Sequence, residues 1–368
     1  MQDAKQNIRL VDSKQQRESL FDFAAIQRFA NDEKIEFDKL RRVVYALFHG
    51  HESIDQALSR LSSESRERLQ SVFELHALEV VDRHDSREDF SSKFVLRTRD
   101  SNLIETVLLR SATGRTSVCV SSQVGCGAGC PFCATSRMGL KRNLTTAEIV
   151  EQVRLAARIA KTENRRLRNI VFMGMGEPLD NQSSLFSTIE KLTDPQLFDI
   201  PHRRILVSTV GVPDGMRDIS NRFPGIHLAL SLHSARPELR RRLVPWTKHY
   251  SLDELASALR YVAERHRTHR QQGNVMIEYI MISGVNDGHD DLQSLIEFLQ
   301  GISAHVNLIP YNPIPDGPNW LPTPREQRDA FANQLREAGI FTTIRYSMGS
   351  DIQAACGQLV QQQIATNS

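Results

Sequence analysis

The sequence predicts an α/β fold with a parallel sheet, preceded by a helical region of about 90 residues and followed by a short C-terminal extension. From about residue 115 onward, apolar runs of strand length alternate with amphipathic helical segments. Capping signatures open two of these helical segments, and polar residues follow the ends of several predicted strands. Repeated strand–helix units indicate a parallel sheet, which is either a closed or partial barrel or an open doubly wound sheet.

The N-terminal residues 1–92 are expected to form a helical domain, because apolar side chains recur there at helical spacing. Residues 93–111 contain two strand-like runs around a polar turn and are predicted to form a β-hairpin linker. We place the α/β core at 112–348 and a C-terminal segment at 349–368. The helical apolar sets are Phe37, Leu40, Val43, Val44 and Leu47, and then Leu69, Val72, Phe73 and Leu75.

Six segments of the core are predicted strands, namely 118–121, 169–174, 204–210, 227–233, 275–282 and 305–310. The segments Thr145–Glu148 and Ser251–Glu254 have the pattern of capping boxes, each followed by a helix with one apolar face. Six units are few for a complete eight-fold barrel. In parallel α/β folds the functional side chains gather at the C-terminal ends of the strands, where this sequence places its cysteine run and several polar residues.

Composition is that of an ordinary globular protein, with 368 residues, 40% hydrophobic residues and a net charge of +2. The sequence has no long apolar run and a polar N-terminus, so we expect a cytoplasmic protein with no membrane segment. In that compartment clustered cysteines bind metal or take part in catalysis. Local basic clusters are typical of solvated helix ends and give only weak support to a nucleic-acid partner. They lie at 161–168, 202–204, 236–242 and 265–270.

Four of the five cysteines lie between positions 119 and 133, and Cys126, Cys130 and Cys133 form a C-x3-C-x2-C run. Three thiolates suit a [4Fe-4S] cluster with one iron left open. A zinc site is the alternative, because Cys119 or His233 could supply a fourth ligand. A glycine-rich turn at 174–178 would bring the backbone close to a ligand, with its glutamate able to accept a hydrogen bond from an ammonium group.

Several motifs together resemble the RlmN/Cfr family of radical S-adenosylmethionine methyltransferases, which act on adenosine in RNA. They are Cys119–Cys126, Cys133-Ala-Thr, Arg142–Glu148, Phe172–Pro178, Ser231–His233 and Asp351–Gln358. The match extends from about Glu105 to Gln358. It implies a partial (β/α)6 barrel of the radical S-adenosylmethionine type, with a [4Fe-4S] cluster bound by Cys126, Cys130 and Cys133. Two S-adenosylmethionine molecules would be used per turnover, with contacts from Gly176, Glu177, Ser208, Ser231, Leu232, His233 and Asn312.

The resemblance also implies a covalent route. Adenine carbons C2 and C8 are electrophilic, so an electrophilic methyl donor cannot methylate them by simple displacement. In the family, the residue matched by Cys356 carries the methyl group as S-methylcysteine, and a 5′-deoxyadenosyl radical abstracts hydrogen from that group. The carbon radical adds to adenine, and the residue matched by Cys119 then releases the product through a transient disulfide with Cys356. Glu105 matches the proton acceptor.

The partners that follow from the resemblance are RNA and an electron donor such as flavodoxin. Large-subunit ribosomal RNA is the first candidate substrate and tRNA the second, with the N-terminal region as an RNA-binding accessory domain. Motifs at 126–130, 139–143 and 349–351 favour methylation at C8, whereas the Ser-Gln-Val-Gly stretch before Cys126 favours C2. Two alternatives remain: a radical enzyme of the same fold with another substrate, and a zinc-stabilised RNA-binding module without catalysis.

Overall fold

The computed structural model describes residues 17–268, 275–314, 317–345 and 348–359. Four of the expected segments extend outside these residues: the first sixteen positions of 1–92, three short stretches of 112–348, the last nine positions of 349–368, and part of the basic cluster at 265–270. The chain divides into two compact units, one ending at His76 and the other beginning at Ala77.

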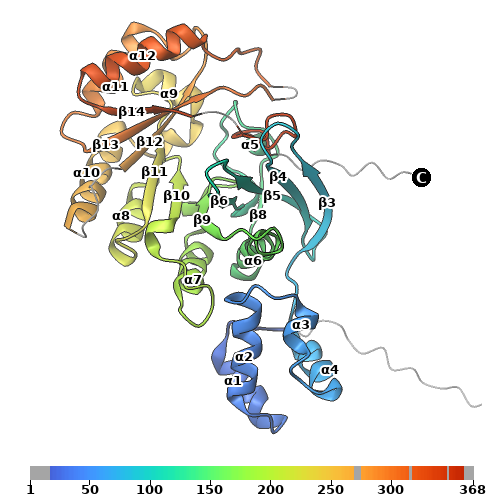
Figure 1. Cartoon of the computed structure of the whole chain (residues 1–368). Coiled ribbons are helices and arrows are strands. Elements are labelled where there is room, and N and C mark those ends of the chain that lie inside the picture. Colours follow the sequence, from blue (N-terminus) through green and yellow to red (C-terminus); the bar gives the residue numbers. More distant parts are fainter. Residues whose placement is uncertain (1–16, 269–274, 315–316, 346–347, 360–368) are drawn as a thin grey trace, which may run out of the picture. The chain divides into compact units, whose positions relative to one another are not determined.

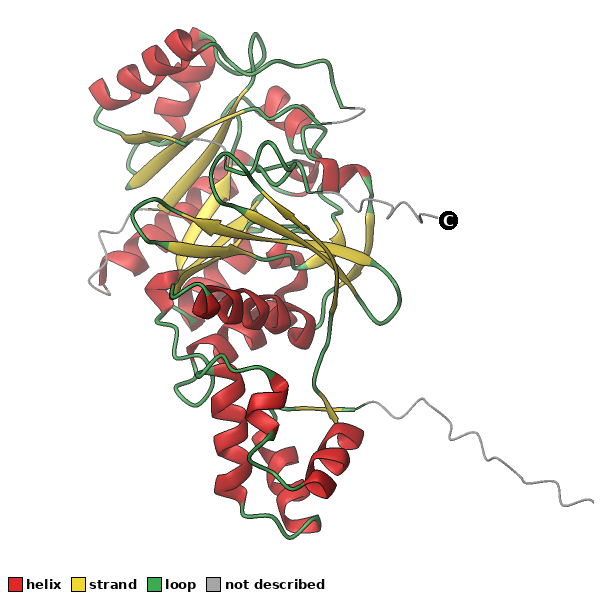
Figure 2. Ribbon diagram, turned by 45° about the vertical axis from the view of Figure 1, so that its right-hand side comes forward, coloured by secondary structure: helices red, strands yellow, loops and turns green. Residues whose placement is uncertain are grey.

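Over residues 17–76 the N-terminal unit consists of four helices and one short two-stranded ladder (Figure 2). Its elements are β1 Glu18–Ser19, α1 Phe23–Asp32, α2 Phe37–Phe48, α3 Ile54–Leu58, α4 Ser63–Val72 and β2 Phe73–Glu74. The helix expected from the first apolar set is confirmed as α2. The second set is only partly helical, because α4 ends at Val72. Phe73 instead pairs with β1 and packs edge-on against Phe29, with ring centroids 5.4 Å apart.

The second unit contains a ten-stranded sheet with the strand order β14-β13-β12-β11-β10-β9-β6-β5-β4-β3. Neighbouring strands from β6 to β14 are parallel, and those from β3 to β6 are antiparallel. The strands are β3 Glu79–Asp85, β4 Ser92–Arg97, β5 Leu103–Arg110, β6 Thr116–Cys119, β9 Leu167–Phe172, β10 Ile205–Thr209, β11 His227–Ser231, β12 Val275–Met281, β13 Ala304–Pro310 and β14 Phe341–Ile344.

A helix follows each of the six strands β6 and β9–β13, which gives six strand–helix units (Figure 1). The helices are α6 Thr146–Thr162, α7 Gln182–Thr193, α8 Pro213–Arg222, α10 Leu252–Thr268, α11 His289–Phe298 and α12 Arg325–Glu337. The edge strands β3 and β14 do not pair with each other, so the sheet remains open. The predicted partial barrel is therefore confirmed. Both predicted capping boxes form, at Thr145–Glu148 and Ser251–Glu254.

The sequence pattern did not predict two strands of this sheet. β3 carries charged side chains and is mostly exposed, so it lacks the alternation typical of a half-buried strand. β14 is short and adds a seventh parallel strand. The predicted hairpin is present as β4 and β5 and belongs to the main sheet.

Several smaller elements lie in the connections between the strands of the main sheet. They are the ladder of β7 Gln123–Gly125 with β8 Leu140–Asn143, the helices α5 Ala134–Arg137 and α9 Pro237–Leu243, and the 3-10 turns Pro178–Asn181, His202–Arg204 and Pro245–His249. Every helix in the described ranges is too short or too polar to cross a membrane.

Candidate active site

A cavity of about 150 Å³ lies at the C-terminal ends of the parallel strands. Its wall brings together residues that are far apart in the sequence, as the strand-end argument predicts. Most of the expected site residues are part of this wall: Cys126, Cys130, Cys133, Gly176, Glu177, Ser208, Ser231, His233 and Cys356. Leu232 and Asn312 do not line it, although each is bonded to residues next to it.

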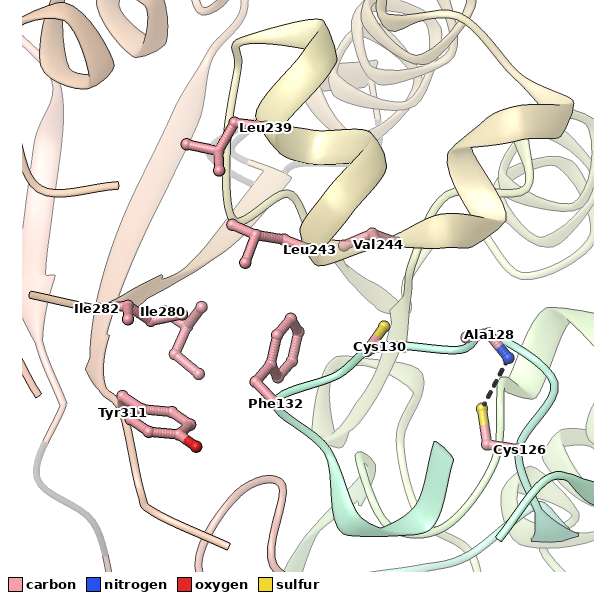
Figure 3. Close-up of a cluster of buried hydrophobic side chains, with 10 residues drawn as sticks. All are labelled: Cys126, Ala128, Cys130, Phe132, Leu239, Leu243, Val244, Ile280, Ile282 and Tyr311. Atoms are coloured by element: carbon pink, nitrogen blue, oxygen red, sulfur yellow. Dashed lines mark hydrogen bonds between the residues drawn. The ribbon is translucent and has the colours of Figure 1, made fainter. Parts of the chain in front are cut away.

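The cysteine run lies in a buried loop that leads from β7 into α5. Cys126, Cys130 and Phe132 of this loop belong to one apolar cluster (Figure 3). The partners in that cluster come from α9, β12, the residue that follows each of them, and the segment after β13, namely Leu239, Leu243, Val244, Ile280, Ile282 and Tyr311. The Phe132 ring packs edge-on against His233, with centroids 4.9 Å apart. This packing buries Cys126 and Cys130, and the partly buried Cys133 packs against the same cluster.

The pKa values of the cysteine thiols indicate what kind of group this loop can bind. Burial raises the pKa of Cys126 to about 12, and burial with the neighbouring thiols raises that of Cys130 well above its usual value. Thiolates here therefore require a strongly positive partner, which a bound iron cluster supplies. Within the described residues no three His, Cys, Asp or Glu side chains are arranged to hold a metal ion. Cys126, Cys130 and Cys133 nevertheless line the same cavity, and three thiolates are by their chemistry the donor set that suits a [4Fe-4S] cluster with one open iron.

The glycine-rich turn after β9 is tightly packed against β7, the strand that leads into the cysteine run. Gly176 has a φ of +104°, and a Cβ there would lie 2.6 Å from Gln123 Cβ. Glu177 is 2% exposed, and its carboxylate accepts hydrogen bonds from the backbone N–H groups of Leu179 at 3.0 Å and Val210 at 2.8 Å. Burial raises the pKa of Glu177 to about 7. The carboxylate thus ties two strand-end loops together at the cavity wall.

The ends of β10 and β11 supply the next part of the wall. Ser208 and Ser231 lie with their hydroxyl oxygens 3.2 Å apart. His233 is held in the left-handed region at a φ of +59°, and its Nδ1 accepts a hydrogen bond from the Ile280 N–H at 3.1 Å. Burial, with a smaller contribution from Arg240, lowers the pKa of His233 to about 3. The imidazole is therefore neutral at physiological pH.

Arg240 holds the ends of β10 and β11 together by hydrogen bonds. It was not singled out in the sequence analysis. It is 0% exposed and donates hydrogen bonds to the carbonyl oxygens of Ser231, Leu232 and Val210. In the sequence it is one of several arginines in the basic cluster at 236–242, most of which are exposed. No local signal distinguishes it, because its burial depends on strands β10 and β11 packing around it.

Cys356 lies in the C-terminal segment. Hydrogen bonds connect this segment to Asn312 and to α5. The Asn312 amide donates to the carbonyl of Cys356 at 3.2 Å, and Ala134 N–H donates to the Gly357 carbonyl at 2.8 Å. Thr135 Oγ1 donates to the Leu359 carbonyl at 2.6 Å. The segment is thus attached to α5, directly after the cysteine run, and the Cys356 side chain faces the main cavity.

A smaller cavity of about 90 Å³ connects the two cysteines outside the cluster run. Cys119 and Cys356 both line it, together with Cys133, Met173 and Arg345. Burial, and secondarily Cys356, raises the pKa of Cys119 to about 12. Cys356 lines both cavities, so the structure brings together the two cysteines that the sequence predicts to cooperate.

Glu105 lies on β5 behind these cavities and lines neither of them. It is 0% exposed, and its Oε1 lies 3.2 Å from the Nζ of Lys93, which is 1% exposed. Lys93 Nζ also lies 3.4 Å from the Gln353 carbonyl oxygen, which belongs to the segment that carries Cys356. Lys93 was not predicted, because a lysine in an apparent hairpin is typical of a solvent-facing position.

Two further charged residues of the wall escaped the sequence analysis. Arg345 follows β14, itself not predicted, and lines both cavities. Glu278 lies on β12 and is 3% exposed; its Oε2 accepts from Asn307 Nδ2 at 2.8 Å, and its Oε1 has no hydrogen-bond partner among the described residues. Both reach the wall of the main cavity through the packing of the strands, which no local sequence pattern contains.

A model of the radical SAM superfamily matches residues 120–299. Together with the open strand–helix barrel and the three-cysteine loop, this match defines the chain as a radical S-adenosylmethionine enzyme. A solved radical SAM methyltransferase from Sphaerobacter thermophilus is 37% identical, with a TM-score of 0.86 over 92% of this chain and 98% of that one.

Curated relatives narrow the class further. A protein of Rhodopirellula baltica, named as a probable RNA methyltransferase, is 42% identical over 94% of this chain and 88% of its own length. A protein of Moorella thermoacetica, named as a probable dual-specificity RNA methyltransferase RlmN, is 42% identical over 83% of this chain and 85% of its own. The chain belongs to the RlmN family of radical S-adenosylmethionine RNA methyltransferases. This membership excludes the zinc-stabilised module without catalysis and implies a [4Fe-4S] cluster and S-adenosylmethionine as cofactors.

Proposed function

We propose that this protein places a methyl group on a ring carbon, C2 or C8, of an adenosine in RNA through an S-methylcysteine intermediate. Large-subunit ribosomal RNA is the first candidate substrate and tRNA the second. The observation that carries this proposal is the position of Cys356, which lines both the cavity of the cluster cysteines and the cavity of Cys119. A methyl carrier must meet both the radical source and the resolving thiol.

Cys126, Cys130 and Cys133 would hold the cluster. When bound, the cluster and S-adenosylmethionine supply an electron and a radical that makes a methyl carbon reactive. The chain's own contribution is to orient the cofactor from the strand ends and to exclude water by the buried wall. A second S-adenosylmethionine would methylate Cys356. The residues proposed to contact the cofactor are Gly176, Glu177, Ser208, Ser231, Leu232, His233 and Asn312.

Cys356 and Cys119 perform the covalent part of the reaction in this proposal. Cys356 carries the methyl group and becomes joined to the adenine through a thioether. Cys119 then attacks the Cys356 sulfur as a thiolate, so an S–S bond forms as the S–C bond breaks. The methylene carbon takes the electron pair and a proton, which completes the new methyl group. The shared cavity supports this pairing of thiols.

Glu105 is the proposed acceptor of the proton lost from the modified carbon. Its ion pair with Lys93 supports the charged carboxylate, which is the form that accepts a proton. The Glu105 N–H lies 3.3 Å from Met175 Sδ, in the glycine-rich turn, so the base is attached to the cofactor side of the site. Catalytic hydrogen bonds often tighten only when the substrate is bound.

We also propose an electron donor of the flavodoxin class and an RNA-binding role for the N-terminal domain. The N-terminal unit has a core of its own, with Phe29, Leu40 and Leu47 buried inside it. Its exposed helix face carries arginines such as Arg41 and Arg42. Replacing both with glutamate should weaken RNA binding in a filter-binding assay without altering the colour of the cluster.

The decisive experiment uses anaerobically reconstituted protein, reductant, labelled S-adenosylmethionine and protein-free RNA, either large-subunit ribosomal RNA or tRNA. Digested nucleosides are compared by mass spectrometry with 2-methyl- and 8-methyladenosine standards. Labelled product of either kind supports the proposal and assigns the carbon. Cofactor cleavage with neither product would favour the same radical machinery acting on another substrate.

Two variants test the covalent steps in the same assay. Cys356→Ala should abolish methylation, because it removes the methyl carrier. Cys119→Ala should accumulate a protein–RNA crosslink, because the thioether forms and is not resolved. Full methylation by Cys356→Ala would contradict the S-methylcysteine route.

A further inference from the structure

Arg345 lies where the two cavities meet. Its backbone N–H donates to the Leu308 carbonyl at 2.8 Å, which continues the pairing of β14 with β13. Its Nη1 lies 3.9 Å from Met173 Sδ, and Met173 also lines both cavities. The guanidinium is therefore held between the main cavity, with Cys356, and the smaller cavity, with Cys356 and Cys119.

The surroundings of Cys119 contain few charges. Strand β5, strand β9 and the residue after β9 flank it with the uncharged side chains Val107, Leu109, Val171 and Met173. The charged and titratable groups facing it are Cys356 and Arg345, with Cys133 elsewhere on the same cavity wall. Glu278 lies on β12 and acts on Arg345. Among the described residues that line this cavity, Arg345 is thus the cation that can stabilise a thiolate at Cys119.

The two sulfurs compete for this cation. Cys356 is the largest influence on the pKa of Arg345, which is raised, and Cys119 has a smaller effect of the same kind. After burial, Cys356 is also the group that raises the pKa of Cys119, whereas Arg345 lowers it. A thiol with a pKa of about 12 is ionised in roughly one molecule in 100,000 at pH 7. The resolving step, however, requires the thiolate.

We propose that Arg345 is a positioning residue whose guanidinium is shared by the sulfurs of Cys356 and Cys119 and serves Cys119 alone once Cys356 is methylated. The inference rests on the proposed function, because it assumes a methyl group on Cys356. A thioether sulfur carries no negative charge, so methylation removes both the repulsion on Cys119 and the competitor for the guanidinium. Glu278 helps to keep the guanidinium at the junction.

This arrangement makes the resolving thiol reactive at the stage that needs it. Before methylation, Cys119 is mostly protonated, which disfavours a premature disulfide with Cys356. After methylation, the Cys119 thiolate can attack the Cys356 sulfur. The S–S bond forms, the S–C bond breaks, and the methylene carbon takes the electron pair and a proton from solvent. The two sulfurs lose the two electrons that the carbon gains.

The test measures how fast Cys119 reacts with a small thiol reagent, methyl methanethiosulfonate, over a pH series. It uses cluster-loaded holoenzyme without RNA, and peptide mass spectrometry to follow Cys119 alone. Four forms are compared: the unmethylated wild type, verified by intact mass, the single variants Cys356→Ala and Arg345→Met, and the double variant. Cys356→Ala should raise the Cys119 rate about tenfold at neutral pH, which corresponds to one pKa unit.

Arg345→Met should lower the Cys119 rate and remove the response to Cys356→Ala. Without the guanidinium the two sulfurs no longer share a cation, so removing Cys356 frees no positive charge for Cys119. Arg345→Lys should retain part of the response, because it keeps the charge but not the planar fork. Arg336→Met is the matched control, since that exposed arginine lies on α12, outside both cavities. It should leave all rates unchanged.

Equal Cys119 rates in all four forms, including no reaction in any, would overturn the inference. So would a Cys356→Ala effect that persists in Arg345→Met. The assay requires no RNA and no turnover, so its outcome is separate from that of the methylation assay. A protein that passes the thiol test but makes no methyladenosine would leave the coupling intact and overturn only the proposed reaction.

Discussion

The buried ion pair of Lys93 and Glu105 shows how single residues support this site. The two side chains are 1% and 0% exposed, and their charged atoms lie 3.2 Å apart. Lys93→Met should lower the free energy of unfolding by about 3–5 kcal/mol, because it leaves a buried carboxylate without its counter-ion. It also removes the contact with the Gln353 carbonyl. Urea denaturation measures the change.

Two comparisons make this prediction specific. Arg97→Met breaks an exposed pair with Glu79 and should cost less than about 1 kcal/mol. Adding Glu105→Leu to Lys93→Met should restore much of the lost stability, since no charge then remains buried alone. A Lys93→Met variant as stable as Arg97→Met would show that the pair contributes nothing to the fold.

His233 should give the protein a pH-dependent stability. Burial lowers its pKa from 6.5 to about 3, so below pH 6.5 the unfolded chain binds a proton that the folded chain does not. The stabilisation by the neutral ring is complete above pH 6.5 and is lost as the pH falls toward about 3. His233→Asn should flatten this profile, measured by urea denaturation at several pH values. Asparagine tolerates the φ of +59° and can accept from Ile280. An unchanged profile would contradict a buried neutral imidazole.

The residues that the sequence predicted and those it missed differ in a physical way. Cys126, Cys130 and Cys133 are recognisable because their spacing is itself the signal. Arg240, Arg345 and Lys93 are single charged residues in polar stretches, and the ordinary expectation for such residues is solvent exposure. Their burial results from strands far apart in the sequence closing around them, which local patterns do not contain.

At the level of elements, the turn after β9 depends on a glycine that no other residue can replace. Gly176→Ala would place Cβ 2.6 Å from Gln123 Cβ at a φ of +104°. It would therefore disturb the 2.8 Å hydrogen bond from the Glu177 N–H to Gln123 Oε1. We expect the melting temperature to fall sharply and anaerobic binding of S-adenosylmethionine, followed by equilibrium dialysis, to be lost.

Gly284→Ala is the matched control for this turn. Gly284 also has a positive φ, +67°, but a Cβ there meets nothing within 4 Å. It should cost only about 1 kcal/mol, from backbone strain alone. If both variants behaved alike, backbone conformation rather than close packing would explain the need for glycine at position 176.

The strand–helix units were predictable as elements because each has its own periodicity and, for α6 and α10, its own capping box. The missed elements depend on partners elsewhere in the chain. β3 is defined by its antiparallel pairing with β4, and α4 ends where Phe73 pairs with β1. Such boundaries are set by long-range pairing, which overrides local helical spacing.

At the scale of the whole molecule, the division at His76 and Ala77 predicts two separate unfolding transitions. Leu40 is 1% exposed in the core of the N-terminal unit, and Leu295 is 0% exposed on α11 of the second unit. Leu40→Ala should destabilise its own unit by about 2–5 kcal/mol through the cavity it creates. Thermal unfolding followed by far-UV circular dichroism should show this shift, whereas loss of the cluster's visible absorbance should occur at an unchanged temperature.

Leu295→Ala should have the opposite effect: it should lower the temperature at which the cluster absorbance is lost and leave the N-terminal transition unchanged. If either variant shifted both signals together, the two units would unfold as one cooperative body, and the N-terminal helices would contribute to holding the cluster site rather than acting as a separate domain.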